Sequence, residues 1–142
     1  MDTGNETRSA ALHWHLPPAP AAVGLVRRRL DAALRERDVP DEAHEAVLLV
    51  ANELAANAVE HGEGSVDVDA TFSDGSVRIA VRDASADPPR LRSPSPSSLR
   101  GRGLLVVDSL ATRWNWSTDG AGKTVWAEVP TDRALDGAAQ RP

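Results

Sequence analysis

The sequence predicts an α+β fold, a two-layer α/β sandwich in which a mixed or antiparallel sheet carries helices on one face. Apolar residues recur at helical spacing in two long segments, 20–37 and 41–61. Apolar and polar residues alternate in the shorter segments that follow, as expected for strands with one buried face. The predicted order is strand, helix, helix, strand, strand, loop, helix, strand, strand.

Composition limits the classes of protein that this chain can belong to. Its 142 residues fit one domain, and 41% hydrophobic residues can form a real core. The chain has no cysteine, which excludes disulfides and thiolate metal sites and fits a cytoplasmic protein. A net charge of −5 argues against direct nucleic-acid binding or an anionic-membrane surface, and no apolar run is long enough to span a bilayer.

The first elements follow from short patterns. Residues 1–10 are polar and are expected to form a disordered leader, and residues 12–16 alternate like a short edge strand that the following prolines stop. Residues 20–37 form an amphipathic helix, whose cluster of arginines we interpret as a solvated face rather than a partner surface.

The second helix, 41–61, carries two distinct faces. Asp41 is its expected N-cap, and Gly62 is expected to end it in a left-handed conformation. Glu53, Asn57 and His61 are four residues apart and therefore share a polar face. A carboxylate can accept a proton and an amide oxygen can bind a hard metal ion, so together they suggest phosphoryl-transfer chemistry without establishing it. The apolar face is formed by Val47, Val50, Ala51, Leu54 and Ala58.

A β-hairpin is predicted next, with strands at 65–72 and 77–82 joined by a turn that contains Asp-Gly. Asp83 comes directly after the second strand. Its carboxylate could accept a hydrogen bond from an amine, such as the exocyclic amino group of a nucleobase, or it could cap a turn. The residue alone favours neither.

Residues 84–100 are rich in Pro, Ser and Arg, and a loop of this length is usually a lid, a binding loop or disordered. Gly101-Arg102-Gly103 follows, before an apolar helix that begins with Leu104. Glycines before a helix let the backbone approach an anion, although a plain turn is the more common meaning of the pattern. Strands are expected at 113–117 and 123–129, and residues 131–142 read as a polar tail. We expect the four tryptophans to lie mainly in the core.

Taken in order, these motifs resemble the GHKL-type (Bergerat fold) ATPase domain that gyrases, heat-shock chaperones, mismatch-repair proteins and histidine kinases share. The chain is most similar to the stand-alone branch, the anti-sigma-factor serine/threonine kinases and their actinobacterial relatives. The stretch from Glu53 to Gly62 matches the N box of that family, Gly101-Arg102-Gly103-Leu104 its second glycine box, and 122–126 its last strand. The resemblance covers residues 11–130 as one ATPase domain.

The resemblance implies ATP and Mg²⁺ as ligands and assigns roles to several residues. Glu53 would be the general base, Asn57 would hold Mg²⁺ through its side-chain oxygen, and Asp83 would bind the adenine amino group with the support of Thr124. The remaining nucleotide-binding positions would be His61, Pro88, Gly101, Arg102, Gly103 and Leu104.

The resemblance also implies protein partners, namely a sigma factor, an anti-anti-sigma factor or both, and a homodimer. Two functions remain open: a serine/threonine kinase that phosphorylates an anti-anti-sigma partner, and a nucleotide-dependent module that sequesters its partner with little or no phosphate transfer. The chain departs from the family pattern in one place. Relatives often place glycines after the adenine-binding Asp, whereas residues 84–89 contain none.

Overall fold

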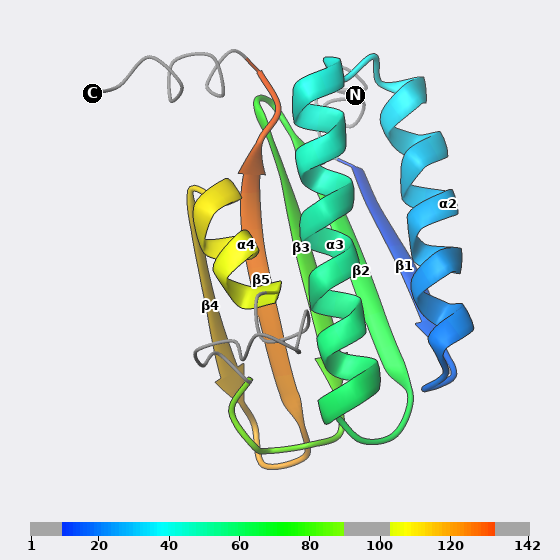
Figure 1. Cartoon of the computed structure of the whole chain (residues 1–142), viewed down its shortest axis with the longest axis vertical. Coiled ribbons are helices and arrows are strands. Elements are labelled where there is room, and N and C mark those ends of the chain that lie inside the picture. The colour runs from blue at the N-terminus through cyan, green and yellow to red at the C-terminus, as the bar shows by residue number, and fades with distance from the viewer. Residues whose placement is uncertain (1–9, 90–102, 133–142) are drawn as a thin grey trace, which may run out of the picture.

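The computed structural model describes residues 10–89 and 103–132 (Figure 1). The predicted leader up to residue 9, residues 90–100 of the predicted lid, and the tail beyond residue 132 lie outside the described residues. The elements in chain order are β1 (Ala10–Leu16), α2 (Pro20–Glu36), α3 (Asp41–His61), β2 (Val66–Ser73), β3 (Ser76–Asp83), α4 (Gly103–Leu110), β4 (Arg113–Thr118) and β5 (Lys123–Pro130).

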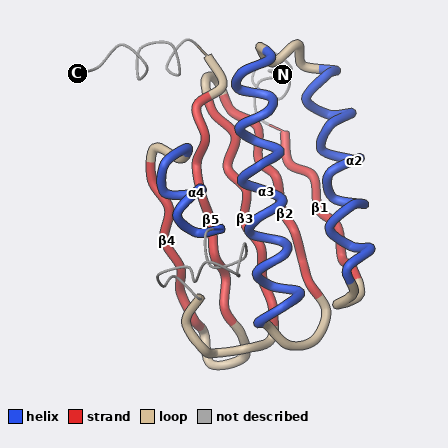
Figure 2. The backbone as a smooth tube through the Cα atoms, viewed as in Figure 1, coloured by secondary structure: helices blue, strands red, loops and turns tan. Residues whose placement is uncertain are grey.

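The five described strands form one sheet in the order β1-β2-β3-β5-β4, and every neighbouring pair is antiparallel. The three described helices all lie on the same face of this sheet (Figures 1 and 2). The predicted α+β sandwich is therefore confirmed, and the sheet is antiparallel rather than mixed.

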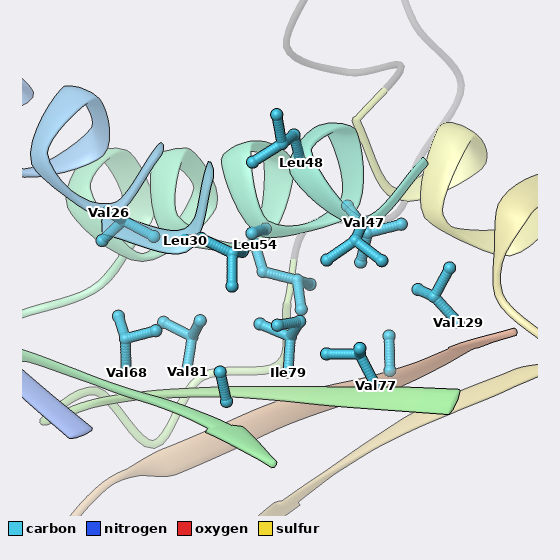
Figure 3. Packing of buried hydrophobic residues seen from close by; sticks show 14 of the residues in the cluster. Val26, Leu30, Val47, Leu48, Leu54, Val68, Val77, Ile79, Val81 and Val129 are labelled. Carbon is cyan, nitrogen blue, oxygen red and sulfur yellow. The ribbon is translucent and has the colours of Figure 1, made fainter. Parts of the chain in front are cut away.

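Helix α3 lies over the middle of the sheet and contributes the largest share of the core. Its residues Val47 and Leu54 are almost completely buried and face residues such as Ile79 and Val81 of the sheet (Figure 3), and Val50 is buried in the same cluster. Helix α2 packs beside α3, and α4 packs on the other side of α3. The apolar stripes predicted for both long helices are thus the faces that the fold buries.

Both ends of α3 differ from the prediction. The N-cap is Pro40, which has no side-chain hydrogen bond to offer, and Asp41 is the first helical residue. Asp41 still lies in the first turn, where the helix dipole favours a negative charge. Gly62 caps the other end in an extended conformation, with φ −92° and ψ −169°, rather than a left-handed one. Its N–H donates to the carbonyl oxygen of Ala58 at 2.9 Å.

The hairpin between β2 and β3 is confirmed. Ser73 pairs with Ser76, so Asp74 and Gly75 form the two-residue turn. The register places Val68 opposite Val81, both on the buried face.

The tryptophans divide between the two faces of the sheet. Trp14, Trp114 and Trp116 are half-buried and pack against the core, as expected. Trp126 instead lies on the helix-free face, where the guanidinium of Arg78 stacks on its ring at 4.2 Å. Among the described residues, none of the helices combines the length and the apolar character that a bilayer crossing needs.

Candidate functional site

Glu53 and Asn57 lie one turn apart on α3, and both are half-buried. The only hydrogen bond of the Glu53 carboxylate within the described residues is a long one, 3.4 Å, from the amide of the neighbouring Asn52. The Asn57 amide makes no hydrogen bond to another described residue. The helix therefore presents a proton acceptor and an oxygen ligand that the described part of the fold leaves available.

Asp83 lies at the end of β3, where the end of α3 and the start of β5 also meet (Figure 1). The residue is only 3% exposed. Its carboxylate lies directly against Gly62, because a Cβ atom on Gly62 would be 2.5 Å from the Asp83 Cγ. A glycine is required at that position for the strand end to approach the helix end this closely.

The Asp83 carboxylate has two partners. Its Oδ1 accepts a hydrogen bond from the backbone N–H of Ser85 at 2.7 Å, and its Oδ2 lies 2.8 Å from Nζ of Lys123. Both charged side chains of this ion pair are 2% exposed. A buried pair of this kind is stable only when its geometry and additional hydrogen bonds offset the loss of hydration.

Lys123 was not among the residues predicted for the site. The antiparallel register between β3 and β5 places it opposite Asp83. The same register places Thr124 opposite Arg82, on the helix-free face. The structure therefore does not bring Thr124 to Asp83 as expected, because neighbouring residues of a strand point to opposite faces. The alternation in segment 123–129, which puts Lys123 on the same face as Val125, was the signal that could have found it.

The turn before β5 is tied to the end of β3. Arg82 and the backbone N–H of Ala121 both bond to Asp119, and they hold the pKa of this carboxyl below its usual value. A Cβ atom on Gly122 would clash with the carbonyl oxygen of Asp83, so glycine permits the close approach of the two strands here too. These contacts set the position from which Lys123 reaches Asp83.

The other predicted residues that the structure describes lie on α3, on α4 and in the segment after β3. His61 is the exposed last residue of α3, and its ring lies 3.4 Å from the Glu60 carboxylate. Pro88 is exposed beyond the end of β3, in the segment that follows Asp83. Leu104 is 1% exposed in the first turn of α4, which begins at Gly103. Gly101 and Arg102 lie outside the described residues.

The residues present fit a magnesium ion of the kind that takes few protein ligands. No group of three or more His, Asp or Glu side chains within the described ranges could hold a metal by itself. The half-buried Asn57 amide offers one neutral oxygen. Mg²⁺ commonly keeps several waters and binds one or two protein oxygens together with phosphate oxygens, so one amide is a suitable contribution.

A cleft of about 630 Å³ lies elsewhere, between α2 and the start of α3. Its walls include Arg27, Arg35, Asp31 and His44, and His44 bonds to Asp31 at 2.7 Å. Both signs of charge are present along its walls, and Asp31 is paired with both His44 and Arg35, so the cleft has no clear preference for an anionic or a cationic ligand.

Residues 16–129 match the family model for the histidine kinase-like ATPase domain. The chain belongs to this family. Membership makes it an ATP-binding domain of the general type found in ATPases and kinases, and it agrees with the motifs on α3 and at the end of β3. No curated protein matches the sequence.

Three solved structures are similar in fold. The RsbU and RsbW domains of Rv1364c from Mycobacterium tuberculosis superpose with a TM-score of 0.65 at 24% identity, over 84% of this chain and 32% of that one. The histidine kinase domain of the blue-light activated histidine kinase from Erythrobacter litoralis EL346 gives 0.54 at 19%, over 84% and 66%. The SiaB–SiaC complex from Pseudomonas aeruginosa gives 0.63 at 16%, over 90% and 94%. The chain thus spans about a third of the length of the Mycobacterium structure, and these identities support a shared fold.

Proposed function

We propose that this protein is a regulatory serine/threonine kinase of the anti-sigma-factor type, which binds Mg²⁺-ATP and phosphorylates a protein partner in the cytoplasm. The observation that carries the proposal is the arrangement along α3. Glu53 and Asn57 lie one turn apart on one helix, with no bond to another described residue except the long one from Asn52 to Glu53, and Asp83 is held against the end of the same helix at Gly62. One rigid helix thereby positions all three proposed groups. The general base and the metal ligand lie on it, and the carboxylate proposed to recognise the nucleobase lies against its end.

In the proposed reaction, the hydroxyl oxygen of a partner serine attacks the γ-phosphorus of ATP. The bond from that phosphorus to the bridging oxygen breaks, ADP leaves with the electron pair, and Glu53 accepts the hydroxyl proton. Mg²⁺, held in part by the Asn57 oxygen, would supply charge neutralisation on the triphosphate. Among the described residues, the Glu53 carboxylate has only the long contact with Asn52 and no cationic partner. A carboxylate that is not neutralised by a cation is better able to accept a proton.

The partners of the similar structures guide the choice of substrate. The Mycobacterium protein joins an RsbW domain to an RsbU domain, and SiaB was solved as a complex with SiaC. We propose an anti-anti-sigma factor as the phosphorylated partner, a sigma factor as the regulated one, and a homodimer as the working form.

The second candidate function is a module that sequesters its partner in a nucleotide-dependent way with little phosphate transfer. The glycine-free segment after Asp83 favours it. Ser85 in this segment donates its backbone N–H to Asp83, and its hydroxyl oxygen accepts a hydrogen bond from the Asp87 N–H. These two bonds fix the local conformation of the segment.

Titration calorimetry with ATP and Mg²⁺, together with a phosphate-transfer assay on candidate partners, tests the proposal. We expect Asn57→Ala to remove the Mg²⁺ dependence of binding. We expect Glu53→Gln to bind ATP normally but to lower phosphate transfer at least 100-fold, since a positioned base contributes about 10²–10⁴ in rate. Transfer that is unaffected by Glu53→Gln would contradict the kinase, and a wild-type protein that binds ATP and partner without transfer would establish the sequestering module.

A further inference from the structure

The buried ion pair between Asp83 and Lys123 has no part in the proposed phosphate transfer. Lys123 is the only lysine in the chain, yet its side chain is 2% exposed, as is that of Asp83. Taking two charges out of water is costly, and an apolar pair of similar volume is often as stable. A buried pair at the position of a base-recognition carboxylate therefore invites a functional explanation.

The position of Asp83 explains one part of the need for a cation. Its carboxylate touches Gly62 at the C-terminal end of α3, where the helix dipole places partial negative charge. A second negative group there is unfavourable by itself. Lys123, at 2.8 Å, offsets both the carboxylate and the helix end.

The hydrogen-bonding capacity of the pair is not exhausted. A carboxylate can accept about four hydrogen bonds, and Asp83 accepts one from Ser85 and one from Lys123. An ammonium group has three donors, and Asp83 is the one partner of Lys123 among the described residues. Each member of the pair therefore keeps hydrogen-bonding capacity that its partners among the described residues do not use, an acceptor on Asp83 and a donor on Lys123.

Adenine carries the complementary groups at adjacent positions of one edge, a donor at the 6-amino group and an acceptor at N1. We propose that Lys123 is a specificity-determining residue that donates a hydrogen bond to adenine N1 while Asp83 accepts one from the 6-amino group. The inference rests on the proposed ATP binding. Guanine and hypoxanthine present the opposite pattern, O6 and N1–H, so both contacts would be mismatched, and a site that leaves buried polar groups unpaired rejects such ligands strongly.

The test compares nucleotides that each lack one group. The titrated probes are ATP, 1-deaza-ATP, which has no N1 acceptor, and purine riboside triphosphate, which has no 6-amino group. For the wild-type protein we expect 1-deaza-ATP to bind roughly 10- to 100-fold more weakly than ATP, the range for losing a hydrogen bond to a charged group. This comparison needs no variant, so it stands even if a substitution of the buried pair fails to fold.

Variants then assign the effect to the lysine. In Lys123→Met the ratio of the affinities for ATP and 1-deaza-ATP should fall to about one. Purine riboside triphosphate should still bind this variant more weakly than ATP does. Arg113→Met is the matched control, because it removes a cation from the neighbouring strand β4 at a site exposed on the helix-free face. That variant should keep the wild-type discrimination.

The outcomes separate the two proposals. Wild-type protein that binds ATP and 1-deaza-ATP with equal affinity would overturn the role of Lys123 and leave ATP binding intact, and so would a Lys123→Met variant that still discriminates between them. A protein that binds none of the three nucleotides would overturn the proposed function and this inference with it.

Discussion

Asp83 is held by contacts from three parts of the chain. The Ser85 N–H fixes one oxygen, Lys123 fixes the other, and the carboxyl group lies against Gly62. Its orientation is therefore set before any ligand arrives, which would lower the entropy cost of the proposed binding of adenine. At the scale of single residues, Gly62 is the position where an added side chain would meet the Asp83 carboxyl group.

Gly62→Ala should both destabilise the protein and weaken nucleotide binding. The added methyl group would lie 2.5 Å from the Ala58 carbonyl oxygen and 2.5 Å from Asp83 Cγ, so backbone or carboxylate must move. Overpacking of this kind costs about 1–3 kcal/mol. Thermal unfolding and calorimetric titration would measure both effects.

Gly24→Ala is the matched control for that substitution. Gly24 lies inside helix α2, and its added methyl would meet only Arg28 at an ordinary distance of 3.6 Å. Alanine favours a helix interior over glycine by about 0.5–1 kcal/mol, so this variant should be slightly stabilised and should bind nucleotide normally. A Gly62→Ala protein that behaves in the same way would refute the close-approach explanation.

At the scale of elements, the strands are joined by cross-strand pairs on the helix-free face as well as by the core. His13 of β1 bonds to Asp69 of β2 at 2.8 Å, and His15 bonds to Asp67 at 2.6 Å. Near the opposite edge of the sheet, on the same face, Glu128 bonds to Arg113, and this contact lowers the pKa of the Glu128 carboxyl. Polar ladders of this kind fix the register of an exposed sheet face.

The His13 pair predicts a pH dependence. The hydrogen bond from His13 to Asp69 raises the pKa of the imidazole above 6.5. Because the folded pKa is raised, the pair contributes stability below the unfolded pKa of about 6.5 and loses it as pH rises through the folded pKa. NMR titration should give a His13 midpoint above 6.5, and Asp69→Asn should lower it.

Asp31→Asn provides the control for that titration. It removes the partner of His44 between α2 and α3, away from β1. The His13 midpoint should stay unchanged in this variant. An equal shift in both variants would mean that general surface charge, rather than the Asp69 contact, sets the pKa of His13.

At the scale of the whole molecule, one continuous core joins the helical layer to the sheet. It includes residues of all three described helices and of every described strand except β4, whose tryptophans pack at its edge. Helix α3 is central to it and also carries Glu53 and Asn57. The stability of the fold and the position of the site therefore depend on the same helix.

Leu54→Ala should lower the free energy of unfolding by about 2–5 kcal/mol, the usual cost of truncating a fully buried leucine. Leu54 is 2% exposed and lies between the site residues on α3. Leu49→Ala changes the same residue type in the same helix at 37% exposure, and its effect should be within about 0.5 kcal/mol. Denaturant unfolding of both variants measures the difference, and similar losses would contradict the orientation of α3.

Much of the fold could be predicted because it follows from local patterns. The stripe on α3 and the Asp-Gly turn depend only on neighbouring residues, and both were confirmed. The C-terminal cap of α3 was predicted wrongly because Gly62 has an extended rather than a left-handed backbone, at a point where it lies close to Asp83, which is distant in sequence. The assignments of Glu53 and Asn57 remain predictions.

The sequence by itself determined the fold class, the family motifs and the helix that carries the candidate chemistry, because amphipathic periodicity and turn residues act over a few positions. Only the tertiary structure decided which residue of β5 reaches Asp83. Strand β5 pairs with β3 across 40 residues of chain, and a shift of one residue in that register exchanges Lys123 for Thr124. Alternation in segment 123–129 indicates the face on which Lys123 lies, but the long-range pairing that placed this buried lysine beside the Asp83 carboxylate is encoded in no local pattern.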